Sequence, residues 1–353
     1  MHADVVLSDR DRDLFAQGLE DWLPSRVFDA HVHVFGRAGF PAEHEFAPRT
    51  CYLRFGGEHT LEQCQAAVAE VLPGRHFGML SFGTPDPVAQ RETMAAYTGE
   101  ISDNRDRFGM TLVAPEDTVT TLERRIRQYG LIGYKPYRDY VTGMPAEAVR
   151  IPDMLTDEQM GLAHELGLAV TLHIPKSRRL ADPANQEDMV RLSRRFPNAQ
   201  IIIAHIGRAY WLDNVVGNLA GISACPNVWL DTAMVNHVEV LEYTLKHFPR
   251  ERILFGSDAP ISWLRGKSVE INHQYAYLMG EPYSVGSAIY DADHVVEFTF
   301  FYYEMLNAIK EACRRAGVTR TELEGMFWHN AHGLLDRVAR GLHGASGSTP
   351  TGT

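Results

Sequence analysis

Residues 28–36 read FDAHVHVFG, and this stretch decides how the rest of the chain is interpreted. Its apolar residues predict a buried strand, and in a strand the side chains at positions i and i+2 point to the same face. His31 and His33 therefore leave the strand side by side, shortly before Gly36. Two imidazoles on one strand face are costly to bury unless something binds there. The stretch predicts a binding site at a strand end, for which the rest of the chain must supply further groups.

Seven more short apolar runs follow this strand, and amphipathic segments lie between them. The eight runs cover residues 26–34, 75–83, 107–115, 130–137, 167–175, 199–207, 227–234 and 252–260. Their continuous apolar character is typical of strands buried on both faces, as in a parallel sheet. Gly130 and Gly167 stand where helices should end. Eight such units without a Gly-rich phosphate loop predict a closed (β/α)8 TIM barrel of the α/β class, and disfavour an open doubly wound sheet.

The predicted organisation has four parts. Residues 1–25 are expected to form an N-terminal capping segment with a helix, and residues 26–340 are expected to form the barrel. Residues 260–292 are too long and too aromatic for an ordinary barrel loop, so we expect either a lid over the active site or an arm that contacts a partner subunit in a homo-oligomer. The Gly- and Ser-rich residues 341–353 are expected to be a disordered tail.

Composition excludes several classes of partner. The 353 residues carry a net charge of −11 and no block of Lys or Arg, which disfavours binding to nucleic acid. No apolar run is long enough to span a bilayer, and the N-terminus lacks the pattern of a signal peptide, so we expect no membrane association and no export. The four cysteines lack CxxC spacing and are expected to be reduced, structural thiols of a cytoplasmic protein.

Polar residues stand at the ends of the predicted strands. They are His31, His33, Lys135, His173, His205, Asp231 and Asp258. In a barrel these strand ends share one face, where active sites are built. A single buried histidine is more often a hydrogen-bonded core residue than a ligand, but core histidines have no reason to gather at one end of every strand. Imidazoles and a carboxylate that converge in this way predict one divalent metal ion, with zinc preferred and manganese as the alternative.

This arrangement resembles the amidohydrolase superfamily, and GSDAP at residues 256–260 is similar to amidohydrolase family 2. That family includes aminocarboxymuconate-semialdehyde decarboxylase, resorcylate decarboxylase and several lactone hydrolases. The similarity covers about residues 27–262 and also WHNAHGLL at residues 328–335. The resemblance implies a set of metal ligands and a fourth histidine, His205, that contacts the nucleophilic water or the substrate. The implied ligands are His31, His33, His173 and Asp258.

Lys135 and Asp231 have supporting roles in this interpretation. Binuclear members of the superfamily carry a carboxylated lysine at the end of strand 4, where Lys135 stands. Members of family 2 often have a lysine near this position without a second metal, so a second ion held by carboxylated Lys135 is disfavoured. We expect Lys135 to contact substrate or to pair with a carboxylate. Asp231 is expected to support the ligands without binding the metal.

The expected chemistry depends on the metal and on two side chains. A divalent ion lowers the pKa of its bound water from about 16 towards about 7. Asp258 would take the proton and return it to the leaving group, and His205, as a donor, would polarise the substrate carbonyl or hold the hydroxide. Cations in the loops after the strands predict a small anionic substrate, such as a carboxylate or a phosphate, with a carboxylate preferred. The expected substrate contacts are Arg208, Lys135, Tyr137, Lys176 and Trp211.

Two reactions fit these residues. The first is hydrolysis of a lactone, ester or amide bond by metal-activated water, and it is the preferred interpretation. The alternative is non-oxidative decarboxylation of an aromatic or muconate-type acid, in which a protonated group quenches the carbanion. A catalytically inactive barrel used for binding is disfavoured, because every expected ligand type is present.

Overall fold

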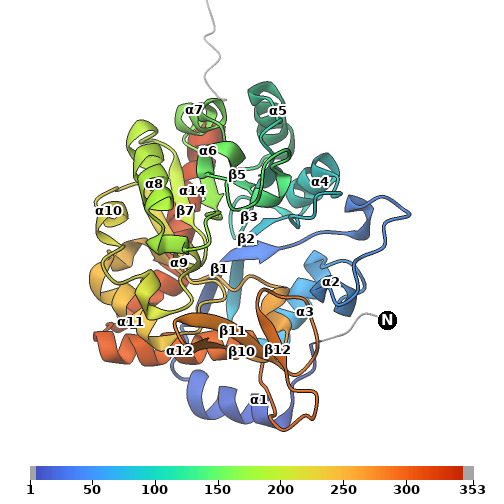
Figure 1. The fold of residues 1–353 in the computed structure, drawn as a ribbon, viewed down its shortest axis with the longest axis vertical. Coiled ribbons are helices and arrows are strands. Elements are labelled where there is room, and N and C mark those ends of the chain that lie inside the picture. The colour runs from blue at the N-terminus through green and yellow to red at the C-terminus, as the bar shows by residue number, and fades with distance from the viewer. Residues whose placement is uncertain (1–4, 345–353) are drawn as a thin grey trace, which may run out of the picture.

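The computed structural model describes residues 5–344, and parallel strands form its centre (Figure 1). The central strands are β1 (Arg26–His33), β2 (His76–Phe82), β3 (Arg107–Gly109), β4 (Thr111–Val113), β5 (Gly133–Pro136), β6 (Ala169–Leu172), β7 (Gln200–Ile203), β8 (Val228–Asp231) and β9 (Ile253–Leu254). Each of the eight predicted runs contains a strand, and all pairings between them are parallel. The prediction of eight buried parallel strands is therefore confirmed.

The strands form two parallel sheets, β1-β2-β3 and β4 to β9, which follow one another in the order of a TIM barrel. β3 and β4 are one run that is interrupted at Met110, so they count as the third barrel strand. The first strand meets the segment after the last one through backbone hydrogen bonds, from the Asp258 N–H to the His31 oxygen and from the His33 N–H to the Ala259 oxygen, both 2.8 Å long. These bonds bring the two ends of the strand series together, as in the (β/α)8 TIM barrel that the sequence predicts. They also bring Asp258 beside the two histidines of β1.

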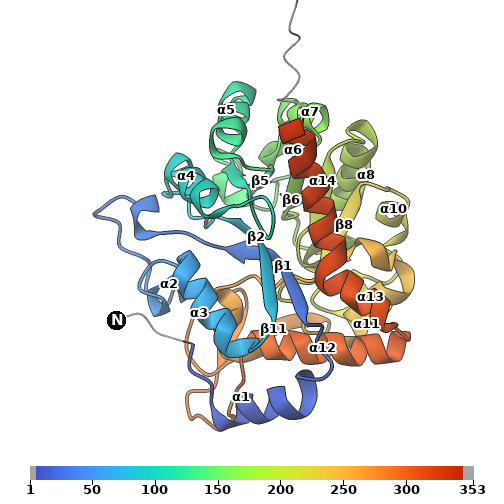
Figure 2. The same cartoon turned by 180° about the vertical axis from the view of Figure 1, so that it is seen from behind.

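Helices surround the strands, as the front and back views together show (Figures 1 and 2). They are α2 (Cys51–Arg54), α3 (Leu61–Val71), α4 (Arg91–Ile101), α5 (Val119–Tyr129), α6 (Ile151–Met154), α7 (Asp157–Leu166), α8 (Pro183–Arg195), α9 (His205–Arg208), α10 (Ala220–Ser223), α11 (Val238–His247), α12 (Phe301–Ala316), α13 (Arg320–Glu324) and α14 (Asn330–Gly344). α5 and α7 end at Gly130 and Gly167, whose positive φ angles of 64° and 65° are left-handed caps. Both predicted helix ends are therefore confirmed.

Three segments lie outside the repeated strand–helix units. The N-terminal segment contains α1 (Asp9–Leu14), as expected for residues 1–25. Residues 260–292 form a small sheet of β10 (Gly266–Ile271), antiparallel β11 (Gln274–Met279) and β12 (Ala288–Tyr290). The expected tail begins later than predicted, because α14 continues to Gly344; residues 345–353 lie outside the described residues.

One hydrophobic core joins the barrel to the closing helices. Phe28 on β1 packs against Phe108 of β3 and against Trp328, which precedes α14. The four cysteines are free and buried, as expected for structural thiols. Within residues 5–344, no helix is both long enough and apolar enough to cross a membrane.

Asp11 ties α1 to the segment that follows β9. Its side chain is fully buried, and it accepts hydrogen bonds from the Arg265 guanidinium at 2.6 Å and from the Thr299 hydroxyl. Burial by itself would raise the pKa of Asp11, but the hydrogen bonds from Arg265 and Thr299 lower it below the ordinary value. The ionised carboxylate therefore stabilises the fold.

We expect Asp11→Asn to lower the free energy of unfolding by about 1.5–3 kcal/mol at neutral pH, because Arg265 loses a charged acceptor. Since the folded pKa is depressed, this contribution is present above the ordinary Asp pKa and is lost as the pH falls through the folded value. Denaturant unfolding at several pH values measures both effects. Asp9→Asn on the same helix, at a fully exposed side chain, should cost less than about 0.5 kcal/mol. Equal losses in the two variants would contradict the prediction.

Candidate metal centre

His31 and His33 on β1 point to one common atom. Their Nε2 atoms each lie 3.3 Å from Oδ1 of Asp258, which follows β9. All three side chains are buried, and their donor atoms form one of the compact groups in the described residues that could hold a metal ion. Histidine nitrogens with a carboxylate oxygen are typical ligands of zinc and related divalent ions. The strand pattern thus brings together three of the four predicted ligands.

The outer nitrogens of these histidines are already bonded. Nδ1 of His31 lies 2.9 Å from Oδ2 of Asp231, and Nδ1 of His33 lies 2.7 Å from the Gly83 carbonyl oxygen. Because a carbonyl oxygen only accepts, the hydrogen of His33 must be on Nδ1, and the Asp231 carboxylate favours the same tautomer in His31. In each ring Nε2 is then the nitrogen without a hydrogen, which is the one that a metal would bind. The residues present therefore fit the divalent ion that the sequence predicts.

Asp231 lies behind His31 and binds the neighbouring strand end. Its Oδ1 accepts from the backbone N–H of His205 at 2.7 Å and of Ala233 at 3.1 Å. Burial would raise the pKa of Asp231, but His31 and the His205 N–H lower it. Asp231 is thus an ionised carboxylate that holds His31, in the supporting position expected from the sequence.

Lys135 on β5 is buried among the histidines. Its Nζ lies 2.6 Å from Nε2 of His31 and 3.5 Å from Nε2 of His33, above the ring of Phe82. No carboxylate of the described residues lies within ion-pair distance of it, so the alternative of a direct charge pair is wrong. Burial lowers the pKa of Lys135 to about 7, although Asp258 and Asp231 oppose this shift. A lysine so placed can lose its proton near neutral pH.

His205 and His173 complete the ring of imidazoles. The ring centre of His205 lies 4.8 Å from that of His31 and 5.3 Å from that of His173. His173 follows β6, is half-buried, and stands outside the compact group of His31, His33 and Asp258. Its role as fourth ligand stays a prediction. Nδ1 of His205 lies 2.9 Å from the Ala233 carbonyl oxygen, so this nitrogen must carry the hydrogen.

Two of the predicted substrate contacts border this ring. The Tyr137 hydroxyl lies 3.3 Å from Nε2 of His33, and its ring stacks on His173. Arg208 donates from Nη1 to the carbonyl oxygens of Ile174 and Pro175, at 3.2 and 3.4 Å, beside His173. Its guanidinium makes no ion pair with a described carboxylate, so its positive charge is available to an anionic substrate.

Of the five predicted contacts, Lys176 and Trp211 behave differently. Lys176 uses its ammonium on the carbonyl oxygens of Glu147 and Ala148, so the structure gives it a loop-bracing contact. Trp211 lies over the guanidinium of Arg179, a residue that sequence reasoning did not select. The only sequence signal for Arg179 is its place among several cations after His173, which does not distinguish it from its neighbours.

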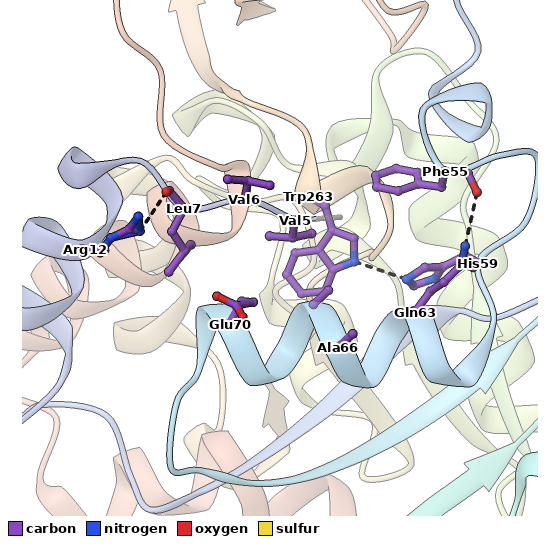
Figure 3. A pocket seen from close by; sticks show the side chains of 11 residues that line it. Val5, Val6, Leu7, Arg12, Phe55, His59, Gln63, Ala66, Glu70 and Trp263 are labelled. Atoms are coloured by element: carbon purple, nitrogen blue, oxygen red, sulfur yellow. Dashed lines mark hydrogen bonds between the residues drawn. The ribbon is translucent and has the colours of Figure 1, made fainter. Parts of the chain in front are cut away.

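A separate pocket lies between the N-terminal segment and α3 (Figure 3). Its volume is about 400 Å³, and its walls include Trp263, Phe55 and His59. Nδ1 of His59 lies 2.6 Å from the backbone oxygen of His33. The Trp263 indole N–H donates to Nε2 of His59 at 3.3 Å (Figure 3). None of the metal-site histidines lines this pocket. His59 therefore braces the strand from outside the candidate metal centre.

Comparison with known proteins identifies one family. The family model described as Amidohydrolase, of amidohydrolase family 2, matches residues 28–337. A search of curated proteins finds no match.

Solved structures with the same fold have low sequence identity. An amidohydrolase from Burkholderia multivorans with bound HEPES is 11% identical with a TM-score of 0.56, over 88% of this chain and 98% of its own. A protein from Agrobacterium tumefaciens is 14% identical with a TM-score of 0.53, over 89% and 94%. The 5-carboxyvanillate decarboxylase from Sphingomonas paucimobilis is 14% identical with a TM-score of 0.51, over 88% and 99%. These likenesses support the barrel fold.

We expect the protein, purified without chelator, to contain one divalent ion per chain by elemental analysis. His33→Ala removes one of the converging Nε2 atoms and should lower the metal content and the affinity for added zinc at least tenfold. His247→Ala, at an exposed position on α11, is the matched control and should keep the metal. Wild-type protein that retains neither zinc nor manganese after dialysis would refute the assignment.

Proposed function

This chain belongs to amidohydrolase family 2, and from that premise we propose that it is a metal-dependent hydrolase of a lactone, ester or amide bond in a small anionic substrate. The observation that carries the proposal is the convergence of two Nε2 atoms on Asp258, with both outer nitrogens held by other groups. A bound divalent ion would polarise a substrate carbonyl and lower the pKa of water towards neutrality. Zinc is the ion we expect first, and manganese the alternative.

Asp258 is suited to accept and return a proton. Its backbone N–H is bonded to β1, which fixes the carboxylate at the two histidines. Burial would raise its pKa, but His31 and His33 hold the pKa well below the ordinary range. The group is therefore ionised at neutral pH and can take a proton from the attacking water. The protonated acid can then deliver that proton to the leaving group.

His205 acts as an acceptor in this proposal, which changes the donor role expected from the sequence. The hydrogen of its ring is committed on Nδ1 to the Ala233 oxygen. Burial lowers the pKa of His205 to about 4, so the ring is neutral near pH 7. Its Nε2 then has only a lone pair and would orient a water molecule by accepting a hydrogen bond from it.

Decarboxylation is the alternative reaction, and Lys135 is the observation that favours it. Its buried ammonium, with a pKa of about 7, could protonate the carbon from which CO2 departs. The fold is compatible with this chemistry, since 5-carboxyvanillate decarboxylase has a similar structure. Incubation with candidate lactones and with aromatic acids separates the two reactions. Release of acid without CO2 supports hydrolysis, and release of CO2 supports the alternative.

The segment 260–292 is proposed as a lid. Tyr275 on β11 packs against Tyr210, whose ring lies 6.4 Å from that of His205. The other expectation, an arm in a homo-oligomer, fits the exposed side chains of Ile289 and Tyr290 on β12. A cytoplasmic location is proposed from the free thiols.

We expect Asp258→Asn to lower kcat at least about a hundredfold in a folded protein, because the amide cannot exchange a proton with water or leaving group. Circular dichroism checks the fold, and metal analysis separates loss of proton transfer from loss of the ion. Asp213→Asn, at an exposed carboxylate in the loop after α9, serves as the control and should keep full activity. Retention of more than about a tenth of the wild-type kcat would rule out the proton-transfer role.

Arg208→Ala should lower kcat/KM for an acidic substrate by roughly ten- to a hundredfold, because a charge-assisted contact to a carboxylate is worth about 1.5–3 kcal/mol. Arg208→Lys should recover part of this loss, since lysine lacks the planar fork. A neutral analogue without the acid group should be affected little. Equal losses on both substrates would show that Arg208 only braces the carbonyl oxygens of Ile174 and Pro175.

A further inference from the structure

Arg179 is a buried cation without a hydrogen-bond partner for its guanidinium. Its side chain is only 8% exposed, and its Nε and Nη1 atoms are buried and unsatisfied. Within the described residues, none of its guanidinium nitrogens makes a hydrogen bond or an ion pair. An unpaired charge in such a place is strongly unfavourable, so its N–H groups need a partner that carries oxygen acceptors.

Aromatic rings surround this guanidinium. Its central carbon lies 4.0 Å from the ring centre of Tyr275, 4.7 Å from that of Trp211 and 5.0 Å from that of Tyr210. Such contacts compensate part of the burial of the charge. They bring no hydrogen-bond acceptor to Nε or Nη1, which stay unsatisfied. The aromatic cage therefore holds Arg179 in place and leaves its N–H groups for a partner.

The cage adjoins the candidate metal centre. Arg179 lies in the loop after β6, six positions beyond His173, and the ring of Tyr210 links it to His205. Burial and the nearby positive charge of Arg208 both lower the pKa of Arg179. No described carboxylate is paired with either arginine. Two unneutralised guanidinium groups near one strand-end site are the arrangement expected of a protein that binds an anion there.

We propose that Arg179, together with Arg208, forms the carboxylate-binding subsite of the metal centre, and that Arg179 restricts the enzyme to substrates with a carboxylate. This inference rests on the proposed function for the reaction, but it concerns recognition and is testable by binding alone. Tyr275 comes from the proposed lid, so closure of β11 over the site positions the arginine that meets the substrate.

The test measures binding of benzoate and of the neutral isostere benzamide to the metal-loaded protein by isothermal titration calorimetry. We expect wild-type protein to prefer benzoate, and Arg179→Gln to weaken benzoate binding by about ten- to a hundredfold with little effect on benzamide. Arg178→Gln, which changes the exposed neighbour, should bind benzoate like wild type. Arg179→Lys should bind with intermediate affinity because it keeps the charge without the planar fork.

Thermal unfolding provides the second readout, because the Tm of each variant shows whether the substitution destabilises the protein. If Arg179 only braces the cage, Arg179→Gln will lower Tm without ligand and leave benzoate affinity unchanged, which overturns the proposal. If it binds substrate, benzoate will raise the Tm of wild type and of Arg179→Lys, and the rise will be absent in Arg179→Gln. Tighter binding of inorganic phosphate than of benzoate would overturn the carboxylate assignment. The binding result and the reaction can fail separately. If Arg179→Gln loses benzoate binding while the metal-loaded wild type turns over no candidate substrate, the subsite proposal stands and the proposed reaction is refuted.

Discussion

The buried hydrogen bond between His31 and Asp231 is the interaction on which the candidate centre depends. It directs Nε2 of His31 towards Asp258, on the side opposite Asp231. The same carboxylate accepts from the backbone N–H of His205 and therefore joins the ends of β1, β7 and β8. A buried carboxylate with three such partners is well compensated, whereas loss of any partner would leave a charge in a low-dielectric interior. The bond thus fixes both a ring orientation and the relative position of three strand ends.

Burial gives the centre its chemical character. It lowers the pKa of His33 and of His205 to about 4 and that of Lys135 to about 7, because each cationic form is poorly solvated inside the barrel. His33 and His205 consequently keep the lone pairs that a metal ion or a water molecule requires, whereas the carboxylates of Asp231 and Asp258 raise the pKa of His31. Asp231 and Asp258 remain ionised because neighbouring histidines outweigh the effect of burial. One low-dielectric site therefore combines imidazole ligands with two fixed negative charges, which suits a divalent cation.

Strained backbone places several of the side chains that face this site. His205, Arg208, Asp258 and Arg179 have φ angles of 57°, 58°, 66° and 60°, in the left-handed region that non-glycine residues rarely adopt. Such conformations persist where the surrounding structure holds them, and they gather at functional sites. Here the strands provide the frame, and the tight turns after β6, β7 and β9 direct the side chains inward. Tyr275 on β11 then covers one of the cations that these turns position.

The sequence by itself determined the strand frame and the composition of the centre. The eight apolar runs predict the barrel, and the two-residue spacing of His31 and His33 predicts their shared face because side chains alternate along a strand. Gly130 and Gly167 likewise mark helix ends, since only glycine adopts the left-handed cap without strain. The tertiary structure alone decided which nitrogen of His205 is free, that no described carboxylate pairs with Lys135, and that Arg179 turns inward while Lys176 braces a loop. These features depend on carbonyl oxygens, aromatic faces and turn angles that distant segments contribute. A local pattern of residue types therefore cannot predict them.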